Sequence, residues 1–195
     1  MTSTSPMKNR ILSATQALIL ERGYNAFSFA DIAAQVGIRK ASIHHHFPTK
    51  ADLVQELVRV YRLDYQTGLE RALSENTNPR DQLAAYGEFW KLCIGSDTQP
   101  ICLMVLLASE IKTLPVDVAT AVRDHLDELS AAFARMLERG AASGVFHLTD
   151  SPASEAEFYM AAIHGAMLTA RSHGDAIRFS RVADLALNRL TAEAR

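Results

Sequence analysis

Residues 28–50 read SFADIAAQVGIRKASIHHHFPTK, and their pattern predicts two short helices joined by a tight turn. Gly37 lies between the two, where glycine can take the left-handed conformation that ends a helix and begins a turn. Ala33 is small enough to let the second helix approach closely, and Ile43 is placed to anchor that helix in the core. The stretch therefore predicts a helix-turn-helix.

The helices of this stretch have an apolar side and a polar side. The apolar side is supplied by Ile32, Val36, Ile38 and Ile43. The polar side chains left to face a partner are Arg39, Lys40, Ser42, His44 and His46. Cationic, hydroxyl and imidazole groups on one face favour a partner rich in phosphate, which points to DNA.

Size and composition limit the class of protein. With 195 residues, the chain is long enough for one large domain or for one small and one medium domain, and its 48% hydrophobic residues are ample for a packed core. No apolar run reaches the roughly 18 residues that a membrane-spanning helix needs, so we expect no membrane partner. The N-terminus is polar and there are only two cysteines, so we expect a cytoplasmic chain with free thiols.

The net charge of −2 hides an asymmetry along the chain. Residues 1–60 contain seven basic and four acidic side chains, a net charge of +3, whereas the remainder has a net charge of −5. A basic end on an acidic body suits a head that binds duplex DNA and is carried on a soluble body.

Apolar residues recur with helical spacing almost throughout, and no segment alternates with period two. We therefore predict an all-α fold of about nine helices, with a three-helix head followed by a helical body. Outside the helix-turn-helix, helices are expected over residues 6–22, 49–75, 80–95, 101–113 and 115–140, from 152 onward and over 176–192, with a break at 95–100. Gly23 is expected to end the first helix. Ser28 with Asp31, and Thr49 with Asp52, have the spacing of a capping box.

Four segments keep the residue types and spacing of a known family: Ala17–Gly23, Phe29–Ala33, Val36–Ile38 and Ser42–Leu53. Through them, residues 9–60 resemble the DNA-binding head of the TetR family of transcriptional repressors. The body agrees with that family only in the number and length of its helices. The resemblance implies a DNA-binding domain over residues 1–50 and an effector-binding and dimerisation domain over residues 51–195. It also implies a homodimer that binds a near-palindromic operator in double-stranded DNA.

The resemblance also assigns DNA contacts. Positions that contact bases or nearby phosphates in the family are matched by Lys40, Ala41, Ser42, His44 and His46, and a phosphate-binding position by Lys50. Ser28 is placed to donate its backbone N–H or its hydroxyl to a phosphate. Two residues depart from the family pattern, since His44 replaces a tyrosine and Arg39 replaces a small hydroxyl residue. Arg39 can reach either a guanine edge or a phosphate, and we favour the phosphate.

The three consecutive histidines do not predict a metal site. Neighbouring helical side chains point about 100° apart, so three in a row cannot grip one ion. We expect His45 to pack inward or against the first helix while His44 and His46 face DNA, and we expect no metal and no cofactor. The chain shows no Gly-rich phosphate loop and no paired-carboxylate or nucleophile motif. An enzyme with an accessory helix-turn-helix therefore has no support, and no catalytic residue is predicted.

Large or soft side chains on the apolar faces of the body fit either ordinary core or the lining of an effector pocket. They are Tyr86, Phe89, Trp90, Met104, Phe133, Met160, His164 and Met167. Core is the simpler explanation for each one singly, whereas together they suit the small-molecule pocket that the resemblance implies. Tyr86, Trp90 and His164 would supply its few polar groups.

The two last helices carry the residues that match the family's four-helix dimer interface. One supplies a surface of small residues, Ala161, Ala162 and Gly165, and the other an apolar stripe of Phe179, Val182, Ala186 and Leu190. The alternative is a seam inside one chain, which explains part of this apolar surface.

Cys102 leaves a further alternative open, a regulator that responds to thiol-reactive or electrophilic compounds. Some members of the family that sense such compounds carry a cysteine at the start of the sixth helix, preceded by glycine. Here Ile101 precedes Cys102, and no adjacent lysine or arginine would lower the thiol pKa, so a buried, inert cysteine is the competing interpretation. We predict a repressor that a small-molecule inducer releases from its operator. A transcriptional activator on the same scaffold is equally compatible with the DNA contacts.

Overall fold

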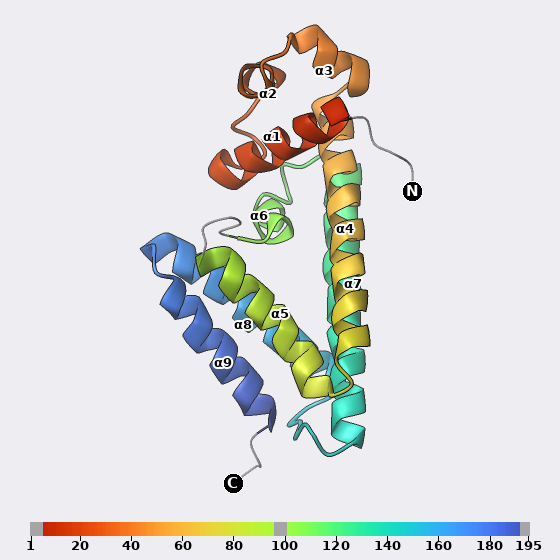
Figure 1. Ribbon diagram of the computed structural model, residues 1–195, viewed down its shortest axis with the longest axis vertical. Helices are drawn as coiled ribbons and strands as arrows, with labels where there is room; N and C mark the ends of the chain where they lie inside the picture. Colours follow the sequence, from red (N-terminus) through yellow and green to blue (C-terminus); the bar gives the residue numbers. More distant parts are fainter. Residues whose placement is uncertain (1–5, 96–100, 192–195) are drawn as a thin grey trace. The chain divides into compact units, whose positions relative to one another are not determined.

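The computed structural model describes residues 6–95 and 101–191, and all regular structure in these ranges is helical (Figure 1). The helices are α1 (Pro6–Arg22), α2 (Phe29–Val36), α3 (Lys40–His46), α4 (Lys50–Glu75), α5 (Pro79–Gly95), α6 (Leu103–Ser109), α7 (Val116–Ala142), α8 (Pro152–His173) and α9 (Ala176–Thr191). The prediction of an all-α fold with about nine helices is confirmed over the described residues. None of these helices is long and apolar enough to span a bilayer.

The chain divides into two compact units. The first contains the described residues up to Asp64 together with Leu103–His125, and the second contains those of 65–102 and 126–195. The long helices α4 and α7 therefore contribute to both units. These units are defined by packing, and the boundary at residue 50 between a DNA-binding and an effector-binding domain stays a prediction. The segment with α6 belongs to the first unit because α6 packs against α1 (Figure 1), a contact between distant segments that no local pattern reveals.

Short polar motifs start α2 and α4, and glycines end α1 and α2, where the sequence predicts. Thr49 donates its N–H to the carboxylate of Asp52 at 2.9 Å, and Asp52 donates its N–H to the hydroxyl of Thr49 at 3.1 Å. This is the predicted capping box at the start of α4. Gly23 (φ 82°) follows α1 and Gly37 (φ 75°) follows α2, so both take the left-handed conformation that ends a helix.

The segment after residue 100 differs from the prediction. A helix was expected over residues 101–113, but α6 ends at Ser109 and is followed by turns. In these turns Glu110 donates its N–H to the carbonyl of Leu107 at 3.0 Å, and Thr113 donates to the carbonyl of Glu110 at 2.8 Å. These hydrogen bonds join residues three apart, which makes a narrower turn than the four-residue spacing of an α-helix. The break expected at 95–100 falls mostly on residues 96–100, which lie outside the described residues. Residue 192, the expected last residue of the final helix, also lies outside them.

Apolar side chains from several helices of the first unit form its core. Its fully buried side chains include Ile11 and Ile19 from α1, Ile32 from α2, Ile43 from α3, and Leu53, Val54 and Val58 from α4. Polar contacts reinforce this packing at the edge of the core. Glu56 of α4 accepts from Lys8 of α1 and from Arg59, both at 2.6 Å. The hydrogen bonds from Arg59 and Lys8 lower the pKa of Glu56 to about 2, so α1 and α4 are joined by an ionised carboxylate.

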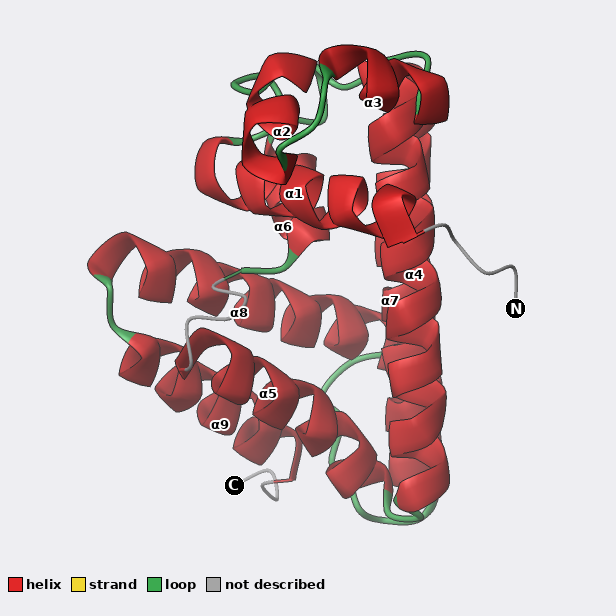
Figure 2. Ribbon diagram, turned by 45° about the horizontal axis from the view of Figure 1, so that its top comes forward, coloured by secondary structure: helices red, strands yellow, loops and turns green. Residues whose placement is uncertain are grey.

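In the second unit, α9 lies against both α5 and α8 (Figure 1 and Figure 2). The largest fully buried side chains of the second unit are Trp90 of α5, Phe133 of α7, Tyr159 of α8 and Phe179 of α9. The ring of Phe133 meets those of Tyr86 and Tyr159 edge to face, with centroids 4.9 and 5.5 Å away. This core is therefore built around aromatic contacts of the kind that add to the burial of apolar area.

His125 should make the first unit sensitive to acid. The residue is 2% exposed, its ring lies 5.9 Å from that of Tyr61, and burial lowers its pKa from 6.5 to about 4. As the pH falls, the unfolded chain therefore binds a proton at this site before the folded chain does. The stability that the neutral ring contributes is complete above pH 6.5 and is lost between pH 6.5 and 4.

We expect this residue alone to lower the free energy of unfolding by about 2 kcal/mol between pH 8 and pH 5. Urea titrations of the wild type and of His125→Phe at both pH values measure the effect. The variant should show a shallower pH dependence by about that amount. An equal loss of stability in both proteins would contradict a neutral, buried His125.

Candidate nucleic-acid interface

α2, the turn after it and α3 form the predicted helix-turn-helix. α2 ends where the N–H groups of Gly37 and Ile38 both donate to the carbonyl of Ala33 at 3.0 Å. Arg10 of α1 donates to the carbonyl of Val36 at 2.8 Å and so satisfies the last turn of α2. Arg10 is not among the predicted residues, because nothing in the local sequence pattern connects residue 10 with a carbonyl 26 residues later. The result is a turn held by backbone bonds and by a side chain from α1.

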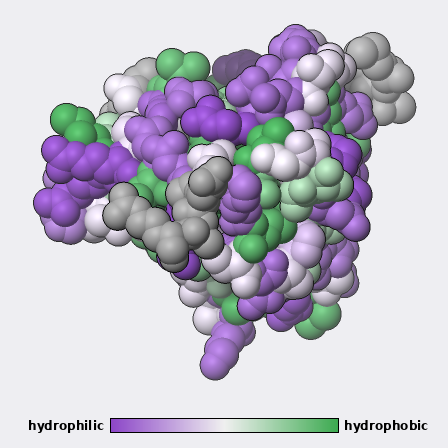
Figure 3. Space-filling model, turned by 90° about the horizontal axis from the view of Figure 1, so that it is seen from below, coloured by the Kyte–Doolittle hydropathy of each residue, from purple (hydrophilic) through white to green (hydrophobic). Residues whose placement is uncertain are grey.

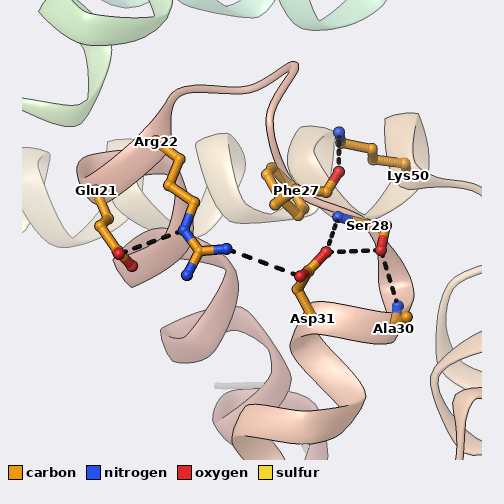
Figure 4. Close-up of polar contacts among 7 residues, drawn as sticks. All are labelled: Glu21, Arg22, Phe27, Ser28, Ala30, Asp31 and Lys50. Atoms are coloured by element: carbon orange, nitrogen blue, oxygen red, sulfur yellow. Dashed lines mark hydrogen bonds and ion pairs between the residues drawn. The ribbon is translucent and has the colours of Figure 1, made fainter.

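Ser28 uses its donors within the chain (Figure 4). Its N–H and its hydroxyl both donate to the carboxylate of Asp31, at 2.7 and 2.6 Å, and its oxygen accepts from the N–H of Ala30 at 3.2 Å. The two donors of Ser28 lower the pKa of Asp31, and Arg22 lies 3.8 Å from the same carboxylate. The predicted capping box is confirmed. The predicted contact of Ser28 with phosphate is not favoured by this geometry, because an ionised carboxylate already occupies both donors.

α3 presents polar groups around a single apolar anchor. Ile43 is its one buried residue and is 0% exposed. Of the residues predicted to contact DNA, Arg39, Lys40, Ala41, Ser42 and His44 are exposed and His46 is half-buried; we call these six the α3 surface. Arg39 is the N-cap residue of α3, and its side chain makes no capping hydrogen bond. The arrangement is that of a short helix held from behind, with its polar side outward.

The three histidines have different surroundings. Nδ1 of His44 lies 3.3 Å from the carbonyl oxygen of Pro48, and its ring meets that of Phe29 edge to face at 4.7 Å. Because a carbonyl only accepts, Nδ1 carries the proton in this contact, and Nε2 of a neutral ring is left as an acceptor. His45 is exposed, so the expectation that it packs inward was wrong. Ile43 alone fills the inward position of so short a helix, and His45 points away from it.

Lys50 is held more closely than the sequence predicts. Its ammonium donates to the carbonyl of Phe27 at 2.5 Å and lies over the rings of Tyr24 and Phe27, 4.6 and 3.9 Å from their centroids (Figure 4 shows the bond to Phe27). Burial lowers the pKa of Lys50, and the negative charges of Glu110 and Asp31 offset part of that effect. The cation is therefore a link between the start of α4 and the loop before α2, whatever further contact it makes with a phosphate.

Comparison with known proteins places this helix-turn-helix in a family. The family model of bacterial regulatory proteins, tetR family, matches residues 11–57, from α1 into α4. The crystal structure of a transcriptional regulator of the TetR family from Agrobacterium tumefaciens is similar to the whole fold. It has a TM-score of 0.92 and 46% sequence identity over 95% of this chain and 97% of that one. The chain belongs to the TetR family. The resemblance seen in the head thus extends to the body, and the prediction that the chain is no enzyme is confirmed by membership of a family of non-enzymatic regulators.

Two mycobacterial relatives in the family carry functional names. The transcriptional repressor KstR2 of Mycobacterium tuberculosis is 35% identical over 77 residues, which is 39% of this chain and 38% of that protein. The transcriptional activator FasR of Mycolicibacterium smegmatis is 26% identical over 144 residues, which is 68% of this chain and 66% of that protein. The chain thus matches little more than a third of the length of KstR2. Relatives named as repressor and as activator both occur.

The residues predicted to line an effector pocket are divided between the two units. Tyr86, Trp90, Phe133 and Met167 are buried in the second unit, and Met160 and His164 are half-buried there. Tyr86 and His164 are within hydrogen-bonding distance, with 3.2 Å between Oη and Nε2. Phe89 is 49% exposed and does not face this interior, and Met104 is buried in the first unit. In the structure Phe89 lies just outside the face of α5 that carries Tyr86 and Trp90. The helical spacing of the sequence alone does not show where that face ends.

The predicted dimer residues of this TetR-family chain also separate into two sets. Phe179, Ala186 and Leu190 are at most 6% exposed, because α9 turns this stripe toward α5 and α8 of its own chain. These three residues cannot face a second copy, and the alternative seam inside one chain accounts for them. Ala161, Gly165 and Val182 are exposed, and Ala162 is half-buried. Exposed residues that the prediction omitted are Phe158, Leu168 and Leu185, at 46, 45 and 69%.

The thiol and metal alternatives gain no support from the described residues. Cys102 is 3% exposed and in no disulfide, so reagents reach it poorly. Cys93 is partly exposed, but burial raises the pKa of its thiol, which makes it a poor nucleophile. Over residues 6–95 and 101–191, no group of three or more histidine, cysteine or acidic side chains is placed to hold a metal ion.

Proposed function

We propose that this TetR-family chain is a ligand-responsive transcriptional repressor that binds a near-palindromic operator as a homodimer. The α3 surface is the observation that carries the proposal. Its polar side chains point outward from a helix that Ile43 anchors, which is the form that enters a major groove. Each copy would present α3 to one half-site, with half-sites about one helical turn apart or a multiple of it.

Lys40 is the residue of the α3 surface whose removal should change the salt dependence most clearly. Each phosphate that a protein neutralises contributes about 0.9 to the slope of log affinity against log salt. We expect Lys40→Ala to reduce this slope by about 1 for each copy bound and to weaken binding broadly across sequences. Fluorescence anisotropy with a labelled duplex at several salt concentrations gives the slope.

Lys112→Ala is the matched control. Lys112 is exposed and lies outside the α3 surface, and its replacement removes the same charge. Its slope should equal that of the wild type. A slope that Lys40→Ala leaves unchanged would show that α3 does not meet the phosphate backbone.

For the homodimer, we propose the exposed face of α8 and α9 as the interface. Phe158, Ala161, Gly165 and Leu168 follow one another at helical spacing along α8, and Leu185 is exposed on α9. Figure 3 shows that apolar residues also reach the surface singly among polar ones, so exposure alone is not the argument. The interface is supported by the continuity of this stripe along α8 and by its small residues, Ala161 and Gly165, which let helices approach closely. Sedimentation of Leu168→Glu should show a monomer where the wild type is a dimer; a dimer in both would exclude this face.

For the effector, we propose an apolar small molecule with a hydrogen-bond acceptor, bound in the second unit near Trp90. Trp90 is 1% exposed, and its indole N–H has no hydrogen-bond partner among the described residues. An unpaired buried donor costs about 1–3 kcal/mol, which an acceptor on a ligand would recover. Trp90 is the single tryptophan of the chain, so its fluorescence reports on this site alone. Compounds that release DNA should change this emission; release without any such change would place the effector elsewhere.

The alternative is an activator on the same scaffold, and it is supported by the relative FasR, which is named as a transcriptional activator. Repression and activation use the same DNA contacts and differ in where the operator lies relative to the promoter. A reporter gene behind the bound promoter distinguishes them, because a repressor lowers its transcript and an activator raises it.

A further inference from the structure

Glu110 lies in the turn after α6 and binds the loop that joins α1 to α2. Its carboxylate accepts from the backbone N–H of Tyr24 at 2.8 Å, from that of Asn25 at 3.3 Å and from the side-chain amide of Asn25 at 2.8 Å. The same amide donates to the hydroxyl oxygen of Thr113 at 2.7 Å, while that hydroxyl donates to the carbonyl of Glu110 at 2.9 Å. We call Tyr24, Asn25, Glu110 and Thr113 the Glu110 clasp. All four lie in the first unit.

Gly23, at the end of α1, lies directly against the clasp. Its φ of 82° strains any residue with a side chain, and a Cβ at this position would overlap the carboxylate of Glu110. The backbone conformation therefore favours glycine here, and a side chain at this position would displace the carboxylate of Glu110.

The loop held by the clasp continues into the helices of the DNA-binding surface. Two residues after Asn25, the carbonyl of Phe27 accepts from the ammonium of Lys50 at the start of α4. The next residue, Ser28, is the N-cap of α2. Glu110 is thus connected through a few bonds to the placement of α2 and, through the turn at Gly37, to α3.

We propose that Glu110 is a positioning residue for DNA binding, which fixes α2 and α3 in place and ties them to the end of α6. The proposal rests on the proposed function, because it gives the clasp a role in binding an operator. Hydrogen bonds to a carboxylate are roughly twice as strong as neutral ones, and the two 2.8 Å bonds, from the N–H of Tyr24 and the side-chain amide of Asn25, hold this loop to Glu110. Hydrogen bonds to DNA need donor–acceptor distances of about 2.7–3.2 Å, which a loosened loop would not maintain on α3.

The test compares Glu110→Ala, Glu110→Gln and the control Glu138→Ala with the wild type. Glu138 is exposed on α7 in the second unit, and its loss changes the net charge equally. Glutamine keeps one carbonyl oxygen for Tyr24 but places an amide N–H₂ against Asn25. The probe is the duplex that the wild type enriches from a random pool, and its affinity is measured where circular dichroism shows every variant folded. Amide hydrogen exchange over residues 23–47 is followed in the same samples without DNA.

We expect Glu110→Ala to lose at least tenfold in affinity and to exchange faster throughout residues 23–47, with Glu110→Gln in between and Glu138→Ala within twofold of the wild type. Asn25→Ala added to Glu110→Ala should cost little more, because both act through the same bonds. Wild-type affinity and exchange in folded Glu110→Ala would overturn the positioning role. If the wild type enriches no duplex, the proposed function fails instead, and the exchange data still show whether the clasp holds the loop.

Discussion

Replacing Ile43 by alanine is expected to lower the free energy of unfolding by about 2–5 kcal/mol and to abolish binding to DNA. α3 has only seven residues, too few to be stable as an isolated helix. Ile43 is its single buried residue and is 0% exposed, so the helix depends on this side chain for its attachment to the core. The loss is a large part of the roughly 5–15 kcal/mol that keeps a domain folded.

Urea titration and DNA anisotropy of Ile43→Ala measure both effects. Ser42→Ala is the matched control, because Ser42 is the exposed neighbour on the same helix. The free energy of unfolding of Ser42→Ala should lie within about 0.5 kcal/mol of the wild type, although the Ser42 hydroxyl belongs to the α3 surface. If Ile43→Ala were as stable as Ser42→Ala, α3 would not be anchored in the way described.

Replacing Gly140 by alanine should destabilise the second unit by about 1–3 kcal/mol, although alanine normally favours a helix. The chain turns back after α7, where Val145 donates its N–H to the carbonyl of Gly140 at 2.8 Å. This turn lays the ring of Phe146, which is 3% exposed, over Gly140. A Cβ on Gly140 would overlap ring atoms of Phe146, so the whole ring must move.

Gly68→Ala in α4 serves as the control, since a Cβ there meets nothing within 4 Å. It should raise the free energy of unfolding by up to about 1 kcal/mol, the ordinary gain of alanine over glycine in a helix. In a Phe146→Ala background the penalty at Gly140 should disappear, because the overlapping ring is gone. A stabilising Gly140→Ala in the otherwise wild-type chain would show that Phe146 does not pack there.

Local chemistry made much of the first unit predictable from sequence. Ser28 with Asp31 and Thr49 with Asp52 act over three residues, and Gly37 acts on its own backbone. Such signals depend on no distant segment, so the helix-turn-helix and the start of α4 are where the sequence predicts. The exposed polar side of α3 follows in the same way, because Ile43 fixes which side faces the core.

Contacts between distant segments could not be predicted. An apolar stripe such as that of Phe179 and Leu190 has the same period whether it covers its own chain or a second copy. The ammonium of Lys50 is held by a carbonyl 23 residues earlier, and Glu110 binds backbone groups 85 and 86 residues earlier. Since a backbone N–H belongs to every residue but proline, no sequence pattern identifies it as a partner. The division of the chain into units depends on the same kind of contact, between α6 and α1.

Selection of bound duplexes from a pool of random DNA tests the central claim most directly. The wild-type chain should enrich a near-palindrome with half-sites about one helical turn apart, or a multiple of it. An α3-surface variant such as Lys40→Ala with His44→Ala should enrich it weakly or not at all. Enrichment of no palindrome by the folded wild type, or of the same one by this variant, would contradict sequence-specific binding through α3.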